Sequence, residues 1–268
     1  MSLWQRFLSK QNDHRNLLLF GKELNLILSR SIWNFISPLV KSAAVILDVG
    51  CGTGTLIYNI SKQMKPNTIV VGLEMQRRRC EMALLKTQGE FICADALHMP
   101  FANETVSMVF STMVIEHVDD KMLLHEICRT LKDGGIFILT TVIRGEGAKY
   151  FYKDGEARSL LAPDHLREYS SEQEILELIK SYGFVIKASI IYPFRLSLPT
   201  AFLSTLYKLF PTKIFEIAAT TDLVSIIRTR LTVLIPRYYF IEMVAKKHHV
   251  PLNQSEVGFG QRLETEAC

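Results

Sequence analysis

The chain has 268 residues, of which 48% are hydrophobic and 22% charged, a balance typical of folded proteins that excludes disorder over most of the length. Its five cysteines are irregularly spaced and include no C-x-x-C pair, which predicts neither a disulfide framework nor a zinc site and favours a reducing, cytoplasmic location. No run of about 18 apolar residues is free of charges, so we expect no transmembrane helix.

The amino-terminal residues 1–42 predict a helical cap. Apolar side chains recur at helical spacing on one face, at Leu17, Phe20, Leu24, Ile27 and Leu28. We expect Pro38 to end this helical region, because proline removes a backbone donor and clashes with the preceding turn.

From residue 45 onward, short apolar runs alternate with amphipathic stretches, as in βαβ units around a parallel sheet. The expected strands are 45–49, 68–73, 90–94, 106–111, 136–142, 184–192 and 238–245. The expected helices are 55–64, 76–86, 121–131 and 172–181, the last with Ser171 and Glu174 as a capping box. The fold class is therefore α/β, with a doubly wound, seven-stranded, mainly parallel sheet formed by residues 43–192 and 237–250.

Residues 193–236 are apolar and punctuated by prolines, with Phe202, Leu206, Leu209 and Phe210 at helical spacing. We interpret them as a helical insertion before the last strand, and residues 251–268 as a carboxyl-terminal tail. Residues 195–247 hold eight basic and three acidic side chains, so the positive charge is concentrated there. This composition suits contact with a lipid-like molecule or peripheral contact with an anionic membrane, and a packed subdomain or dimer contact stays equally open.

A glycine-rich turn follows the first expected strand, in the sequence from Asp48 to Gly54 (DVGCGTG). Ligands of doubly wound sheets bind beyond the carboxyl ends of the strands, where glycines allow close backbone approach. No lysine follows Gly54, which excludes a P-loop, and Thr55 occupies the position of the third glycine in a dinucleotide fingerprint. Asp48 would repel a pyrophosphate and attract an ammonium group, which favours a ligand of mixed charge.

The stretch from Ile46 to Gly54 resembles motif I of the class I S-adenosylmethionine-dependent methyltransferases. The resemblance extends over residues 45–191 and resumes at 239–246. It implies a Rossmann-like methyltransferase fold with S-adenosyl-L-methionine as cofactor and S-adenosyl-L-homocysteine as product. Glu74 matches the family's ribose-binding acid, and Asp95 resembles the residue at the adenine amino group. The cofactor-binding residues so implied are Asp48, Gly50, Cys51, Gly52, Gly54, Glu74, Met75, Asp95, Ala96 and Ser111.

Two residues after the fourth strand are candidate catalytic groups. His117 lies near the expected position of the methyl acceptor, and imidazole exchanges protons readily near neutral pH, so it is the first candidate base. For His117 a local capping role at the start of a helix stays open, and Glu116 is the second candidate base. Glu116 and His117 also resemble the end of an E-x-x-E-H cluster of metal-dependent O-methyltransferases. Because Met113 stands at its first glutamate and a thioether is a poor ligand for hard cations, we predict no metal site.

His165 and Tyr169 are candidate acceptor contacts, because the resemblance places their segment beside the substrate mouth, with loop packing as the alternative. We interpret Arg77, Arg78 and Arg79 as a solvated helix face. The segment 111–114 lacks the prolines of base-amine methylases, which disfavours a nucleic-acid substrate.

The resulting prediction is a methyltransferase that acts on a small-molecule or lipid-like acceptor by O- or C-methylation. A noncatalytic accessory protein that binds S-adenosylmethionine is the alternative. A nicotinamide-dependent oxidoreductase would need a pyrophosphate loop that this chain lacks. The sequence identifies neither the acceptor nor the oligomeric state.

Overall fold

The computed structural model describes residues 28–61, 63–87, 89–148, 152–153, 159–160, 165–197 and 232–248. The apolar pattern at 17–27, most of the expected insertion at 193–236, and the tail at 251–268 lie outside these described residues.

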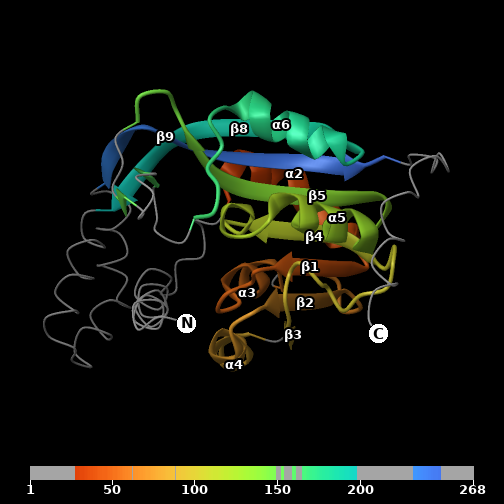
Figure 1. The fold of residues 1–268 in the computed structure, drawn as a ribbon. Helices are drawn as coiled ribbons and strands as arrows, with labels where there is room; N and C mark the ends of the chain where they lie inside the picture. The colour runs from red at the N-terminus through yellow and green to blue at the C-terminus, as the bar shows by residue number, and fades with distance from the viewer. Residues whose placement is uncertain are drawn as a thin grey trace, which may run out of the picture.

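The described residues form a seven-stranded sheet in the order β3-β2-β1-β4-β5-β9-β8 (Figure 1). The strands are β1 (Val45–Val49), β2 (Ile69–Glu74), β3 (Glu90–Cys93), β4 (Val106–Thr112), β5 (Leu131–Arg144), β8 (Phe184–Ser197) and β9 (Thr232–Lys247). The first five run parallel, whereas β9 is antiparallel to both β5 and β8. This order confirms the predicted doubly wound, mainly parallel sheet. A second, two-stranded sheet pairs β6 (Tyr152–Lys153) with β7 (Ser159–Leu160).

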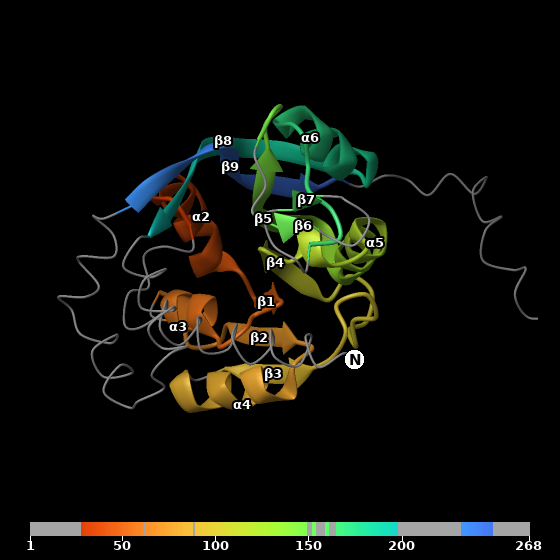
Figure 2. The same cartoon turned by 60° about the vertical axis from the view of Figure 1, so that its left-hand side comes forward.

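Helices cover both faces of the sheet and enclose two apolar clusters (Figure 2). One cluster includes side chains of α2 (Arg30–Ser42) and α3 (Thr55–Ser61), and the other includes side chains of α5 (Asp120–Thr130) and α6 (Glu172–Ser181). Neighbouring residues of β1 divide between them, since Ile46 belongs to the first cluster and Leu47 to the second. Successive strand side chains point to opposite faces, so the near-continuous apolar runs of this sequence supply both layers. The remaining described helices are α4 (Arg77–Lys86) and the 3-10 turn η1 (Ile115–His117).

Local capping explains where two of these helices begin. The Asp119 side chain accepts a hydrogen bond from the backbone N–H of Met122 at the start of α5, at 2.9 Å. The Ser171 hydroxyl accepts one from the Glu174 N–H at the start of α6, at 3.2 Å. In the predicted capping box, the Glu174 carboxylate would accept a hydrogen bond from the backbone N–H of Ser171. In the structure it accepts one from the backbone N–H of Ser170, one residue earlier.

The prediction that Pro38 ends the amino-terminal helix is wrong, because α2 continues through Pro38 to Ser42. Pro38 and Asn34, four residues before it, are both exposed on the outer side of the helix. The Asn34 carbonyl therefore faces outward, where the Ser37 hydroxyl approaches it at 3.5 Å and water can bind. The buried side chains of Ile36 and Val40 hold the helix against the sheet across this interruption.

The ends of the expected helical insertion are also different from the prediction. Residues 193–197 belong to β8 and residues 232–236 to β9, and the two strands pair in this region. The register shifts between Pro193 and Arg195, and β8 is the edge strand of the sheet, which is where a sheet tolerates proline. Within the described residues, no helix is both long enough and apolar enough to cross a membrane.

Candidate active site

The glycine turn between β1 and α3 is held in a conformation that suits glycine at three positions. Gly50, Gly52 and Gly54 have φ angles of +69°, +54° and +74°. A Cβ atom at Gly50 would lie 2.3 Å from Cγ2 of Val114, so the turn packs directly against the connection between β4 and η1. A Cβ atom at Gly52 would meet no atom of the described residues within 4 Å. The backbone at Gly52 therefore faces open space that a ligand can enter.

Asp48 lies at the base of this turn, in the last part of β1, and only 1% of its surface is exposed. Its Oδ1 atom has no hydrogen-bond partner among the described residues. Burial, and then the negative charge of Glu74, raise the pKa of the Asp48 carboxyl well above its ordinary value. A cationic group bound beside this carboxylate would relieve both effects.

Glu74 is the last residue of β2, and its carboxylate is joined to the glycine turn. Its Oε2 accepts a hydrogen bond from the backbone N–H of Gly52 at 3.0 Å, and its Oε1 accepts one from that of Gln76 at 2.9 Å. Nη1 of Arg79 lies 3.9 Å from Oε2 of Glu74, with only 17% of the Arg79 side chain exposed. The prediction of a solvated arginine face is therefore wrong for Arg79, although Arg77 is exposed and pairs with Glu81 on the outer surface.

The other predicted cofactor residues follow β1, β2 and β3 or lie near the end of β4. Asp95 is half-buried, and its Oδ1 accepts a hydrogen bond from the Leu97 N–H at 2.9 Å. Ala96 is buried and Met75 is exposed. Cys51 is buried, and this burial raises the pKa of its thiol. Ser111 is fully buried opposite Val49 of β1, and its hydroxyl has no partner among the described residues. Their cofactor roles stay predictions.

Comparison with known proteins agrees with this geometry. Residues 47–139 match the family described as a methyltransferase domain, and this range includes the glycine turn, Glu74, most of β1 and the strands β2 to β4. Residues 47–139 therefore have the sequence of a methyltransferase domain, and the described sheet has the fold of solved S-adenosylmethionine-dependent methyltransferase structures.

Similar proteins share this domain over part of their length. An uncharacterised protein of Methanocaldococcus jannaschii is 34% identical over 102 residues, which are 38% of this chain and 42% of that protein. A demethylmenaquinone methyltransferase of Lactobacillus johnsonii is 32% identical over 111 residues, with 38% and 46% covered. The chain thus spans less than half the length of these two relatives. A crystal structure described as a putative methyltransferase from Bacillus halodurans superimposes with a TM-score of 0.56 at 16% identity, covering 82% of this chain and all of that one.

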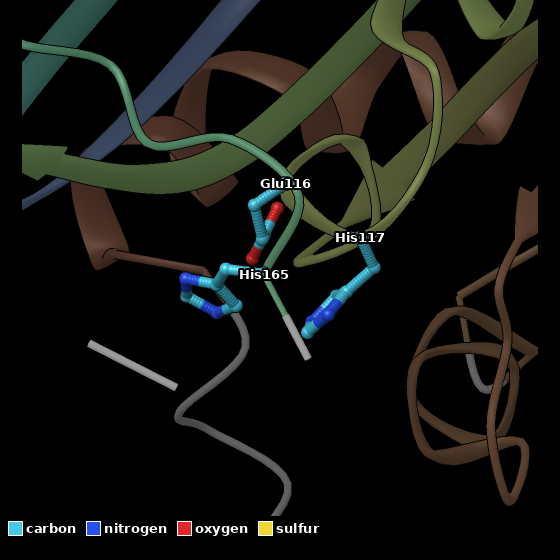
Figure 3. Close-up of side chains that lie close together, drawn as sticks. All are labelled: Glu116, His117 and His165. Atoms are coloured by element: carbon cyan, nitrogen blue, oxygen red, sulfur yellow. The ribbon is translucent and has the colours of Figure 1, made fainter. Parts of the chain in front are cut away.

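The fold brings Glu116, His117 and His165 together (Figure 3). One carboxylate oxygen of Glu116 and one imidazole nitrogen from each histidine all lie within 4.8 Å of one another. The rings of His117 and His165 meet edge to face, with centroids 4.8 Å apart. Glu116 and His165 are buried, and His117 is half-buried. Since η1 follows Val114, and Val114 packs against Gly50, Glu116 and His117 lie on the segment that packs against the glycine turn, whereas His165 comes from a separate segment.

Two side chains that the sequence analysis did not single out hold this cluster in place. The Thr141 hydroxyl of β5 donates a hydrogen bond to Oε2 of Glu116 at 3.0 Å. Oε1 of Glu168 lies 2.9 Å from Nδ1 of His165, and both of these side chains are buried. The spacing of His165 and Glu168, three residues apart, is the one sequence signal that could have indicated the second pair.

Tyr169, the other predicted acceptor contact, is fully buried in the core. Its hydroxyl donates to Oδ2 of Asp120 at 3.1 Å, and its backbone bridges to Ile143 of β5. Burial, and then the charge of Asp120, raise the pKa of Tyr169. The structure gives Tyr169 a packing position, and its contact with an acceptor stays a prediction.

Proposed function

We propose that this domain binds S-adenosyl-L-methionine at the glycine turn and transfers its methyl group to a small-molecule acceptor, releasing S-adenosyl-L-homocysteine. The observation that carries this proposal is Asp48: a buried carboxylate with an oxygen that lacks a partner among the described residues, beside a turn whose backbone is open at Gly52. A buried carboxylate of this kind is stabilised when a cationic group binds beside it.

The residues present fit both polar ends of this cofactor. Asp48 would attract the amino group of its methionine part. Glu74 would accept hydrogen bonds from the ribose hydroxyls, because each of its oxygens already accepts one bond and keeps a second lone pair. Asp95 and Ala96 would contact the adenine, with Oδ1 of Asp95 fixed by the Leu97 N–H. The rest of the cofactor site would be lined by Gly50, Cys51, Gly54, Met75 and Ser111.

Methyl transfer from a sulfonium is an in-line displacement, so the domain's main contribution is to hold the acceptor atom in line with the methyl group. An acceptor that must lose a proton also needs a base. His117 is half-buried on the segment that packs against the glycine turn, and we assign it this role. Glu116 and His165 would then orient its ring and exclude water, since both are buried against it.

For the acceptor we infer a small, lipid-like molecule methylated on oxygen or carbon. The demethylmenaquinone methyltransferase among the relatives supports a hydrophobic ring compound as the acceptor. The apolar, basic composition of residues 193–236 supports contact with an acceptor or a membrane surface from a cytoplasmic location.

The test is a labelling experiment with full-length protein, a cell extract and cofactor carrying an isotopically labelled methyl group. We expect a metabolite of the lipid-soluble fraction to gain the label with wild-type protein. Transfer with His117→Ala should fall by roughly a hundredfold or more while cofactor binding persists. His125→Ala, which removes an exposed histidine of α5, serves as the control. Binding of the cofactor without any labelled product would favour the accessory-protein alternative.

A further inference from the structure

The cluster of Glu116, His117 and His165 has the composition of a metal site. Two imidazoles and one carboxylate converge from η1 and from a separate segment of the chain (Figure 3). The prediction of no metal site considered the residues around Glu116 and His117 alone, where Met113 stands in place of an acid. In the fold, His165 supplies the third donor. It is brought there by its neighbours Leu166 and Arg167, whose backbone N–H groups donate to the Glu116 carbonyl oxygen at 2.8 and 3.2 Å.

The groups behind these side chains orient them as outer partners orient metal ligands. With the Nδ1 proton of His165 directed at Oε1 of Glu168, 2.9 Å away, the Nε2 lone pair of His165 is presented for coordination. The Thr141 hydroxyl fixes one oxygen of Glu116 in the same way. Hydrogen-bonded partners behind the ligands are a regular feature of protein metal sites, because they set the tautomer and strengthen the donor.

We propose that Glu116, His117 and His165 bind a divalent transition-metal ion of the zinc class. Two neutral imidazoles with one carboxylate suit zinc better than magnesium, which prefers oxygen ligands. Donor atoms around a zinc ion stand roughly 3–3.5 Å apart, so these three, now within 4.8 Å, draw together by up to about 1.5 Å when the ion binds. Three protein ligands leave open positions for an acceptor oxygen, and in the ion-bound domain the ion, in place of the His117 imidazole, would promote loss of the acceptor's proton. That last role rests on the proposed function, whereas binding of the ion does not.

Metal binding to the full chain tests this proposal without any measurement of activity. Protein treated with a chelator and dialysed is titrated with Co²⁺ while the ligand-field absorption is recorded, and Zn²⁺ is then used as competitor. We expect one ion per chain, displaced by an equivalent of Zn²⁺ and resistant to an excess of Mg²⁺. Displacement by Mg²⁺ as readily as by Zn²⁺ would overturn the transition-metal assignment.

Substitutions locate the ion within the chain. Glu116→Gln, His117→Ala and His165→Ala should each weaken Co²⁺ binding at least roughly tenfold, and Glu168→Gln should weaken it by about tenfold through loss of orientation. Glu116→Gln keeps an oxygen that can accept the Thr141 hydrogen bond, which limits damage to the fold. His125→Ala removes an exposed histidine outside the cluster and should bind as wild type does.

Absence of Co²⁺ binding by wild-type protein, or undiminished binding by His117→Ala/His165→Ala, would overturn the proposal. Far-UV circular dichroism identifies variants that fail to fold. If a variant fails to fold, metal binding by the cluster is tested in wild-type protein instead. There Zn²⁺ should shift the imidazole NMR signals of two histidines only. Titration with S-adenosyl-L-homocysteine in parallel separates this result from the proposed function, since cofactor binding does not require the ion.

Discussion

Asp48 is buried where its negative charge is unfavourable unless a cation binds beside it. Burial and the nearby Glu74 raise the pKa of its carboxyl, so the folded protein holds the proton more tightly than the unfolded chain does. The contribution of Asp48 to stability is therefore greatest below the ordinary carboxyl pKa of about 4, and it declines as the pH rises from there to the raised pKa.

Asp48→Asn tests this balance. We expect the variant to be more stable than wild type near neutral pH, because no buried charge forms, and to lose the decline in stability as the pH rises. Its affinity for S-adenosyl-L-homocysteine should fall by about tenfold or more, since a charge-assisted hydrogen bond is worth roughly 1.5–3 kcal/mol. Urea denaturation over a pH series measures the expected change in stability. Calorimetric titration measures the expected loss of affinity. A variant less stable than wild type at neutral pH would contradict the argument.

Two glycines of the turn separate packing from ligand access. Gly50→Ala combines a φ of +69° with a contact of 2.3 Å to Val114, and should lower the free energy of unfolding by more than about 2 kcal/mol. Gly52→Ala has the strain of positive φ without a clash, so about 1 kcal/mol is expected. Its new methyl group enters the open space instead, and cofactor affinity should fall more than stability does. Equal stability losses at both positions would count against this description of the turn.

At the scale of elements, Glu242 of β9 anchors α2 to the sheet. Its carboxylate is fully buried and accepts hydrogen bonds from the backbone N–H of Ser29, at 2.8 and 2.9 Å, and from the Tyr192 hydroxyl, at 2.6 Å. Ser29 is the N-cap residue of α2. One acid thus joins the amino-terminal helix, the edge strand β8 and the neighbouring strand β9.

Glu242→Ala should lower the free energy of unfolding by about 3 kcal/mol, because it leaves two donors without partners. Glu242→Gln keeps one acceptor oxygen and should cost less. Urea denaturation measures both, with Glu81→Ala on the exposed side of α4 as a control that changes little. If Glu242→Ala unfolds at the same urea concentration as the control, α2 is held by its apolar face alone.

The sequence predicted the elements better than their ends. Strands 45–49 and 106–111 and helix 172–181 were predicted to within one residue at each end, because local apolar runs and caps define them. The predicted element ends were wrong at three prolines, Pro38, Pro193 and Pro236. The effect of a proline depends on which side of the helix or sheet its missing N–H faces, and the sequence does not show this. Pro193 lies on an edge strand, and Pro236 falls where the register of β8 and β9 shifts. Such positions are set by tertiary pairing.

In the candidate site, too, residues within a short motif could be predicted from the sequence, whereas contacts between separate segments could not. Asp48 and the glycines lie in one short motif after the first strand, and Glu74 ends the next strand, so the sequence alone could indicate them as candidates. The meeting of His165 with Glu116, the contact of Val114 with Gly50, and the turn of Arg79 toward Glu74 depend on the packing of separate segments. No local pattern records these contacts.

For the whole molecule, the strand order places the carboxyl ends of β1, β2 and β4 at one edge of the sheet, with the glycine turn between them. A ligand bound there contacts several strands at once and should stabilise the domain as a unit. At a free concentration of about 100 times its dissociation constant, it would add about 2.7 kcal/mol to the free energy of unfolding. A melting temperature unchanged by saturating ligand would contradict a single cooperative domain built around this site.

Calorimetric titration of the full chain with S-adenosyl-L-homocysteine tests the central claim most directly. We predict binding of one molecule per chain, weakened by more than roughly a hundredfold in Asp48→Asn/Glu74→Gln and unchanged in Glu81→Gln. No heat of binding at millimolar ligand, or equal affinity in the double variant and the wild type, would contradict the account.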